Sequence, residues 1–272
     1  MGATASGEIE LPGGGRALFT DRSQGNMSSV GGEQAGGGLL ARERLRERCG
    51  VDALLRGYQV HGTVIGRVLA DGARRQRSTV ATALAGAAAG NGRASAGERA
   101  DASAASEHDL ANARAWRDSE TQPSFRADGH ATAATRVGAM VLAADCIPVV
   151  LGSQGAVAAV HAGWRGLAAG VLEQGVQALR DVGGVGEIVA VIGPCAGACC
   201  YEVGEQVHVS FGGAHRNGRL IDLRAIAHDR LRAAGVAEVL DVDVCTICDE
   251  RYFSYRREGA GAGRQAAVAW LT

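Results

Sequence analysis

The stretch VLAADCIPVVLGSQGAVAAVHAGWRG, residues 141–166, indicates two buried strands that each end on a side chain able to bind a metal. One apolar run, residues 140–144, is followed closely by Cys146, and a second, residues 156–160, is followed by His161. Both runs are short, rich in small or β-branched residues, and bounded by Gly or Pro, as is typical of buried strands. If the two strands lie side by side, Cys146 and His161 can share a pocket, provided that the register is right.

Working outward from this stretch, the pattern alternates between strands and helices. Upstream we expect a hairpin over 8–11 and 16–20, a helix over 39–49 that ends at Gly50, and strands over 54–60 and 63–69. Downstream we expect a helix over 166–181, a strand over 187–192, a helix over 222–235 capped by Asp222, and strands over 237–245 and 265–271. The fold class is therefore α/β or mixed α+β, with layered mixed sheets flanked by helices in a single domain.

Two segments differ from the rest of the chain in composition. Residues 1–15 are rich in Gly, and we expect a flexible N-terminus followed by one domain over 16–272. Residues 71–124 are rich in Ala, Gly, Ser and Arg and hold few large apolar side chains, so their burial offsets little ordering entropy. We interpret 71–124 as a low-complexity insertion and not as a second domain.

Overall composition excludes several classes of protein. With 272 residues, 46% of them hydrophobic, the chain can build a sizeable core. A net charge of -1 gives no drive toward nucleic acid or membrane surfaces. The sequence has no apolar run of bilayer length and no apolar segment typical of a signal peptide near Met1, so we expect a cytoplasmic protein.

Three side chains form a candidate metal site. His61, Cys146 and His161 each follow an apolar run and neighbour a turn that contains Gly or Pro. Two imidazoles and a thiolate leave a fourth zinc position open, which is the catalytic and not the structural pattern. Spacing alone does not select this trio from the seven histidines and seven cysteines.

The other cysteines allow two interpretations. Cys195, Cys199 and Cys200 lie in one predicted loop, and Cys245 and Cys248 form a CxxC motif. An odd number of cysteines at this spacing is not typical of a disulfide scaffold. The CxxC motif is either a pair of partly buried thiols or half of a structural zinc site, whose other ligands the loop cysteines would have to supply despite two of them being adjacent.

Six motifs resemble, in the same order, those of the bacterial laccase-domain family, whose members were long labelled polyphenol oxidases and are now regarded as purine nucleoside phosphorylases. The motifs are QVHG (59–62), AADCIPVVL (143–151), AAVHAGWRGLAAGV (158–171), IGPCAGACCYEVG (192–204), DLRAIA (222–227) and RYFSYRREGAGAGRQAAVAWL (251–271). The resemblance implies zinc held by His61, Cys146 and His161. It also implies phosphorolysis of adenosine, inosine and guanosine, cleavage of methylthioadenosine, and deamination of adenosine. The chain departs from the family at Ala144, where Thr is usual, and at residues 24–28, where a Gly-Gly-Val-Ser turn is usual.

Phosphorolysis needs a cation that holds phosphate. Arg165, in the turn after His161 and at the start of a helix, is the first candidate, and a salt bridge that fixes the turn is the alternative. Arg22 and Arg256 are further anion candidates, and Gln59 completes the predicted substrate contacts.

Two neighbours of the predicted ligands also allow alternative roles. Asp145 either orients a ligand or moves a proton, or it caps the backbone at a strand end. Trp164 stacks on a purine or packs within the turn.

Three other functions are weighed as alternatives. Cys146 and His161 could act as nucleophile and base of a hydrolase of amide or peptidoglycan-precursor bonds, for which His61 has no necessary role. A copper-dependent polyphenol oxidase is disfavoured, because the chain has seven histidines and no HxH pair, although adventitious copper could enter such a site. A non-catalytic binding protein would need a closed pocket. The sequence specifies no oligomeric state.

Overall fold

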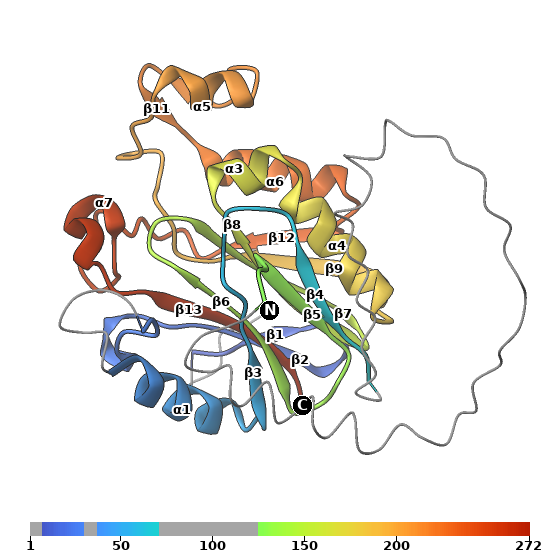
Figure 1. The fold of residues 1–272 in the computed structure, drawn as a ribbon. Coiled ribbons are helices and arrows are strands. Elements are labelled where there is room, and N and C mark those ends of the chain that lie inside the picture. Colours follow the sequence, from blue (N-terminus) through green and yellow to red (C-terminus); the bar gives the residue numbers. More distant parts are fainter. Residues whose placement is uncertain (1–6, 30–36, 71–124) are drawn as a thin grey trace, which may run out of the picture.

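The computed structural model describes residues 7–29, 37–70 and 125–272 (Figure 1). The predicted insertion at 71–124 lies outside these residues, as do residues 1–6. Among the described residues, no helix is long and apolar enough to cross a membrane.

The first of two large sheets has five strands in the order β1-β2-β13-β6-β3. Its strands are β1 (Ile9–Leu11), β2 (Gly15–Phe19), β13 (Gln265–Leu271), β6 (Val137–Ala143) and β3 (Ala53–Leu55). All neighbours are antiparallel except β3 and β6. The β1–β2 hairpin was predicted, and it includes residues 9–15, which we expected to lie outside the domain.

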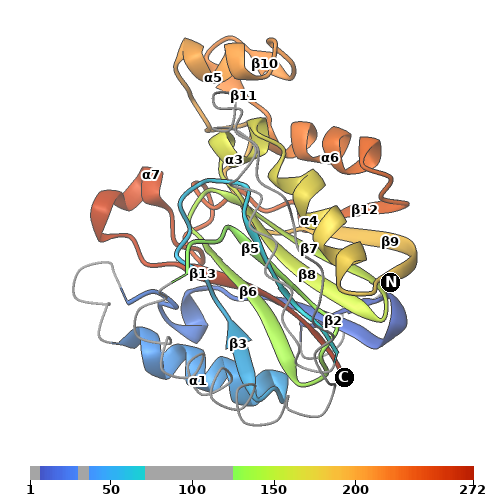
Figure 2. The ribbon, with the colours of Figure 1, turned by 45° about the vertical axis from the view of Figure 1, so that its right-hand side comes forward.

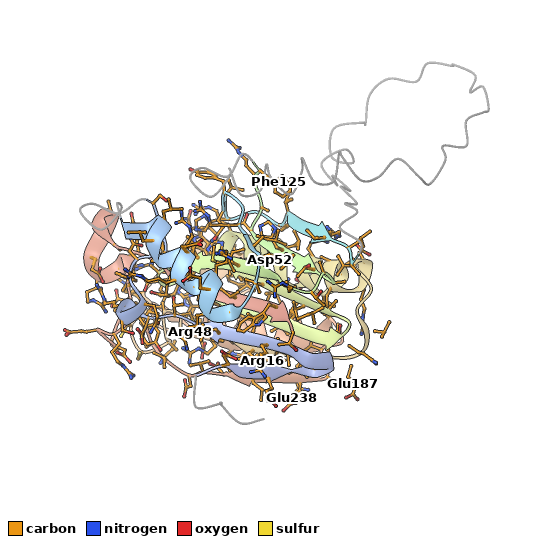
Figure 3. The ribbon with its side chains drawn as sticks, turned by 90° about the horizontal axis from the view of Figure 1, so that it is seen from below. Arg16, Arg48, Asp52, Phe125, Glu187 and Glu238 are labelled. Atoms are coloured by element: carbon orange, nitrogen blue, oxygen red, sulfur yellow. The ribbon has the colours of Figure 1, made fainter. Side chains whose placement is uncertain are left out.

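The second sheet has six strands in the order β12-β9-β7-β8-β5-β4. Its strands are β12 (Glu238–Asp241), β9 (Val185–Ile192), β7 (Ile147–Gln154), β8 (Ala156–Ala162), β5 (Gly129–Thr132) and β4 (Ile65–Val68). The outer pairs β12–β9 and β4–β5 are parallel, and the pairs between them are antiparallel. Glu187 on β9 and Glu238 on β12, both labelled in Figure 3, mark the β12 edge of this sheet.

Helices cover the outer faces of both sheets. Helix α1 (Gly38–Cys49) lies against the five-stranded sheet, while α3 (Trp164–Ala168), α4 (Val171–Asp181) and α6 (Leu223–Ala233) lie on the side of the six-stranded sheet (Figures 1 and 2). The remaining elements are short: helices α5 (Glu205–Ser210) and α7 (Tyr255–Glu258), the hairpin β10 (Arg216–Asn217) and β11 (Leu220–Ile221), and the 3-10 turns η1 (Pro12–Gly14), η2 (Arg22–Gln24) and η5 (Gly259–Gly261).

Alternation along the strands builds three apolar layers. On β6, Met140 and Leu142 belong to the cluster that includes Leu45 of α1, whereas Val141 faces the other sheet. On β7, Val150 belongs to the same inter-sheet cluster as Val141. The neighbours of Val150 on β7 pack instead with the helices of the far side. The order helix, sheet, sheet, helix confirms the predicted layered mixed sheets in a single domain.

The two central runs do not lie side by side in one sheet, which was the condition that we set for a shared pocket. The runs at 140–144 and 156–160 lie in different sheets, as β6 and β8, and β7 separates them in sequence. We did not predict β7 as a separate strand. Cys146 and His161 meet because β7 and β8 form an antiparallel hairpin, in which Ile147 pairs with Ala162 and Pro148 with His161.

Several predicted elements are shorter than expected. The helix predicted over 166–181 breaks into α3 and α4 at Gly170, which has a φ of 92° that favours glycine. The strands predicted over 54–60, 63–69 and 237–245 contract to β3, β4 and β12. Helix α1 ends at Gly50, and α6 begins after Asp222, whose carboxylate accepts a hydrogen bond from the Ala225 backbone, both as predicted.

Candidate metal centre

The side chains of His61, Cys146 and His161 meet near the loops that connect the two sheets. The atoms that they offer as metal ligands all lie within 4.8 Å of one another. Cys146 Sγ lies 3.7 Å from His61 Nε2, and the two imidazole rings meet edge to face with centroids 4.9 Å apart. His61 comes from the loop between β3 and β4, Cys146 directly precedes β7, and His161 lies on β8. The predicted trio is therefore assembled from residues up to 100 positions apart.

A buried carboxylate fixes the orientation of His161. Asp128 is fully buried and directly precedes β5. Its Oδ1 atom lies 2.9 Å from Nδ1 of His161. Burial raises the pKa of Asp128, but hydrogen bonds from His161 and from backbone amides outweigh it and hold this pKa below its ordinary value. Since the carboxylate accepts, His161 Nδ1 donates, and Nε2 is left as the ligand atom. A carboxylate behind a ligating histidine is a common feature of zinc sites.

The same carboxylate holds the turn that carries His61. Three consecutive backbone amides, those of Val60, His61 and Gly62, donate to Asp128 at 3.3, 2.9 and 2.7 Å. His61 has a φ of 60°, a left-handed conformation that is costly for a residue other than glycine. Asp128 therefore stabilises a strained turn and links both histidines of the site.

The ligand side chains influence one another's protonation. Burial raises the pKa of the Cys146 thiol, but the charge of His161 and hydrogen bonds from both histidines lower it below its ordinary value. Burial lowers the pKa of His161, but the Cys146 thiolate and Asp128 raise it above its ordinary value. The arrangement thus favours the thiolate, which is the form of cysteine that binds metals.

Two glycines leave room for the ligands. A Cβ atom on Gly163 would lie 2.4 Å from His61 Cδ2 and 3.3 Å from Cys146 Sγ. A Cβ atom on Gly166 would lie 2.7 Å from the Gly62 carbonyl oxygen. The turn after β8 therefore packs directly against the His61 loop, and only glycine fits at these two positions.

The donor set fits a zinc ion. Two imidazoles and one thiolate, with a carboxylate behind one imidazole, match the chemistry of a zinc site with an open fourth position. The exposed side chain of His61 leaves the site accessible to solvent.

The Asp145 carboxylate forms hydrogen bonds with two other loops. Its Oδ1 accepts from the Thr246 hydroxyl at 2.7 Å, and its Oδ2 accepts from the Ser254 hydroxyl at 3.1 Å and the Arg256 backbone amide at 2.7 Å. Its backbone has a φ of 87° and its carbonyl accepts from Ala196. Because both carboxylate oxygens are already bonded, these contacts favour the backbone-capping alternative over proton transfer or orientation of a ligand.

Arg165 and Trp164 start helix α3 at the rim of the site. The Arg165 guanidinium lies over the Trp164 ring, 4.3 Å from its centroid, and the arginine is exposed. Helix α3 has only five residues, so its N-terminus contributes little to anion binding.

The other predicted substrate residues have structural partners. Arg22 donates to the Tyr252 carbonyl and pairs with Glu258, and Gln59 both donates to and accepts from the backbone of Leu142. Arg256 lies over the Tyr201 ring, 4.6 Å from its centroid, and donates to the carbonyl of Glu202. Of the predicted substrate residues, Arg256 is the one whose backbone amide donates to Asp145, the neighbour of Cys146.

Four residues of the site were not predicted from the sequence: Asp128, Gly163, Thr246 and Ser254. Asp128 precedes a glycine and a short strand, which is a typical turn pattern, and only its burial and its partners mark it as a site residue. Thr246 and Ser254 lie in motifs that we quoted, but their link to Asp145 spans more than 100 residues.

Comparisons with known proteins agree on one family. Residues 19–272 match the model of a family described as multi-copper polyphenol oxidoreductase laccase. A purine nucleoside phosphorylase of Pseudomonas aeruginosa is 38% identical over 169 residues, which cover 56% of this chain and 69% of the relative. The purine nucleoside phosphorylase YfiH of Escherichia coli is 36% identical over 165 residues, which cover 56% of this chain and 67% of the relative.

Solved structures share the fold over nearly the whole chain. A DUF152 protein of Neisseria meningitidis superposes with a TM-score of 0.70 at 25% identity, covering 97% of this chain and 98% of its own. YlmD of Geobacillus stearothermophilus superposes with a TM-score of 0.67 at 22% identity, covering 95% and 92%.

Proposed function

This chain belongs to the family described as multi-copper polyphenol oxidoreductase laccase, and we propose that it is a zinc-dependent purine nucleoside phosphorylase. The observation that carries the proposal is the constellation of His61, Cys146 and His161 backed by Asp128. The names of the P. aeruginosa and E. coli relatives supply the reaction class.

The substrates in this proposal are adenosine, inosine, guanosine and methylthioadenosine, with phosphate as co-substrate. When bound by His61, Cys146 and His161, zinc would supply a Lewis acid and a water of lowered pKa. The same pocket would deaminate adenosine, a reaction that needs such a water near C6 of the base. Zinc is favoured over copper because the donor set has one thiolate and two imidazoles and lacks the several clustered histidines of multicopper sites. Neither nucleic acid nor membrane is a proposed partner.

Arg165 is the proposed phosphate contact. Its guanidinium is exposed, two residues after Gly163, which packs against two of the ligands. A planar guanidinium can donate two parallel hydrogen bonds to phosphate. Trp164 lies under Arg165 and packs against the core of the six-stranded sheet, so its ring supports the position of the guanidinium.

Arg256 and Tyr201 form the opposite wall in this proposal. The Arg256 backbone is fixed by Asp145 and its guanidinium by the Glu202 carbonyl, so its charge stays near the Cys146 loop. Arg22 and Gln59 act through their structural partners, with Arg22 supporting the segment before Arg256.

The test compares five variants on adenosine, with and without phosphate. His61→Ala, Cys146→Ala and His161→Ala should each abolish both adenine release and deamination. Arg165→Ala should raise the KM for phosphate and leave deamination unchanged. An Arg165→Lys variant separates charge from guanidinium geometry. Full phosphorolysis in the His61→Ala protein would refute the metal-dependent proposal.

One observation favours a second candidate, a Cys/His hydrolase of amide or peptidoglycan-precursor bonds. Asp128, His161 and Cys146 form a chain in which a carboxylate orients a base beside a thiolate, as in nucleophilic hydrolases. The two candidates differ in their need for His61. A hydrolase would keep its activity in His61→Ala and would be inactivated by a thiol-specific alkylating reagent after the metal has been removed.

A further inference from the structure

Four of the remaining cysteines form a second cluster, which shares no residue with the site described above. The sulfur atoms of Cys199, Cys200, Cys245 and Cys248 all lie within 4.8 Å of one another. Cys199 Sγ lies 3.4 Å from Cys200 Sγ and 3.6 Å from Cys248 Sγ, and Cys200 Sγ lies 2.9 Å from Cys248 Sγ. The cluster unites the two motifs that the sequence left unassigned, the CC pair and the CxxC pair.

The backbone holds the two cysteine loops together independently of the thiols. Cys195 and Cys245 form an isolated parallel bridge, with the Cys195 amide donating to the Val244 carbonyl and the Thr246 amide donating to the Cys195 carbonyl. On the first loop, the amides of Cys200 and Tyr201 both donate to the Gly197 carbonyl. This tight turn directs the adjacent side chains of Cys199 and Cys200 to the same side, which an extended strand would not do.

Backbone amides also point at one of the sulfurs. The Gly197 amide donates to Cys245 Sγ at 3.2 Å, and the Cys248 amide donates to the same sulfur. Amide donors to sulfur stabilise a thiolate. The Asp249 amide closes the CxxC turn by donating to the Cys245 carbonyl. Nearby, the Arg257 guanidinium donates to the two carbonyls between the cysteines of this motif, which brings a positive charge beside the cluster.

The dimensions suit a tetrahedral metal ion. Four sulfurs at about 2.3 Å from a zinc ion are about 3.8 Å from one another. The sulfur-to-sulfur distances from Cys199 to Cys200 and to Cys248 are within about 0.4 Å of this value. The distance between the sulfurs of Cys200 and Cys248 would have to increase by about 0.9 Å. Four thiolates at a closed position form the structural and not the catalytic class of zinc site.

We propose that Cys199, Cys200, Cys245 and Cys248 bind one Zn²⁺ as a structural site, separate from the site of His61, Cys146 and His161. Binding releases the remaining thiol protons to solvent and changes no oxidation state. This inference does not depend on the proposed function, because it concerns other residues and a different class of site.

The proposed zinc stabilises the loops that position the first site. Thr246, inside the CxxC motif, donates to Asp145, the neighbour of Cys146. The Ala196 amide, in the other loop, donates to the Asp145 carbonyl. A metal that joins the two loops therefore fixes both sets of contacts around Asp145, although it touches no substrate.

The test is the number of zinc ions per chain in full-length protein purified with a reductant. Wild type should bind two. His61→Ala should bind one, and a Cys199→Ser, Cys248→Ser double variant should also bind one. Cys199 and Cys248 are exposed, so serine at both positions does not disturb the core. The matched control is Cys49→Ala, which alters a buried thiol outside both clusters and should still bind two.

Two further measurements separate the sites. In the His61→Ala protein, cobalt should replace the remaining zinc and give strong thiolate-to-metal charge-transfer absorption. A chelator should lower the melting temperature of this protein. Both signals should be absent when His61→Ala is combined with the two cysteine substitutions, since that protein lacks ligands of both sites. The proposal is overturned if the double cysteine variant still binds two zinc ions per chain. It is equally overturned if wild type binds a single zinc ion and the His61→Ala protein binds none. It is also overturned if thiols trapped at cell lysis reveal a disulfide between Cys200 and Cys248.

Discussion

At the scale of single residues, the central feature is Asp128, which is not itself a predicted ligand. Its carboxylate bonds to His161 on one side and to the amides of Val60, His61 and Gly62 on the other. It therefore sets the tautomer of one histidine and the backbone conformation of the other. Removing its charge should affect the metal more than the fold.

We predict that Asp128→Asn weakens zinc binding by about 10- to 100-fold, as is typical when the carboxylate behind a ligating histidine is lost. The amide keeps the shape of the side chain but no longer favours Nδ1–H on His161. Competition with a chromophoric chelator measures the affinity, and circular dichroism checks the fold. Unchanged affinity would mean that His161 does not ligate through Nε2.

Gly163 tests the spacing of the ligands. We predict that Gly163→Ala displaces His61, because the added methyl group would lie 2.4 Å from His61 Cδ2, and that the protein loses zinc and activity. Gly204→Ala is the matched control, since both glycines precede a short helix with an extended backbone and nothing lies within 4 Å of a Cβ atom at 204. Equal zinc contents in the two variants would contradict the geometry of the site.

His130 on β5 predicts a pH dependence of stability. Burial lowers the pKa of this histidine from 6.5 to about 4 in the folded protein. As pH falls, the unfolded chain binds the proton first, so stability is full above pH 6.5 and is lost as pH falls toward 4.

Between about pH 7 and about pH 5, this one group should cost about 2 kcal/mol of unfolding free energy. Urea titrations at both pH values measure the loss, and His130→Gln should reduce it by that amount. If wild type and His130→Gln have the same pH slope, His130 is not buried in its neutral form.

The residue scale also marks the limit of prediction from sequence. His61, Cys146 and His161 each follow an apolar run, but it was the resemblance to the laccase-domain family that selected them from the seven histidines and seven cysteines. Asp128 was not predictable, because its role depends on being fully buried between two loops, and no local pattern distinguishes such an aspartate from a solvated turn residue.

At the scale of elements, the β7–β8 hairpin brings the site together. Pro148 pairs with His161, so Cys146, just before β7, lies at the same end of the hairpin as His161. The apolar run of β7 follows the Asp145–Cys146 turn directly, and from the sequence we assigned it to no strand. Which strands pair is decided by tertiary contacts between distant segments, whereas local composition indicates only that they are buried.

Helix α4 tests the layer on the far side of the six-stranded sheet. Leu172 is fully buried against that sheet, and we predict that Leu172→Ala costs about 2–5 kcal/mol of unfolding free energy through lost contacts and a cavity. Leu40 on α1 is 61% exposed, and Leu40→Ala should change stability by less than about 0.5 kcal/mol. Both variants should retain zinc. Similar losses in the two would contradict the packing described here.

At the scale of the whole molecule, two sheets and their helices hold loops that meet at one edge. The His61 loop joins β3 of the five-stranded sheet to β4 of the six-stranded sheet, and the Asp145–Cys146 turn joins β6 to β7 in the same way. The site thus lies where the chain passes between sheets. The alternation of strands and helices predicted the layers, but the number of sheets and the crossing points depend on long-range pairing that the sequence does not display.

The most direct test of the proposed function measures adenine released from adenosine by metal-free and zinc-reloaded protein, with and without phosphate. We predict adenine together with ribose 1-phosphate only when both zinc and phosphate are present, and inosine from deamination with zinc alone. Equal adenine release without phosphate, or full phosphorolysis by the metal-free protein, would contradict the zinc-dependent phosphorylase.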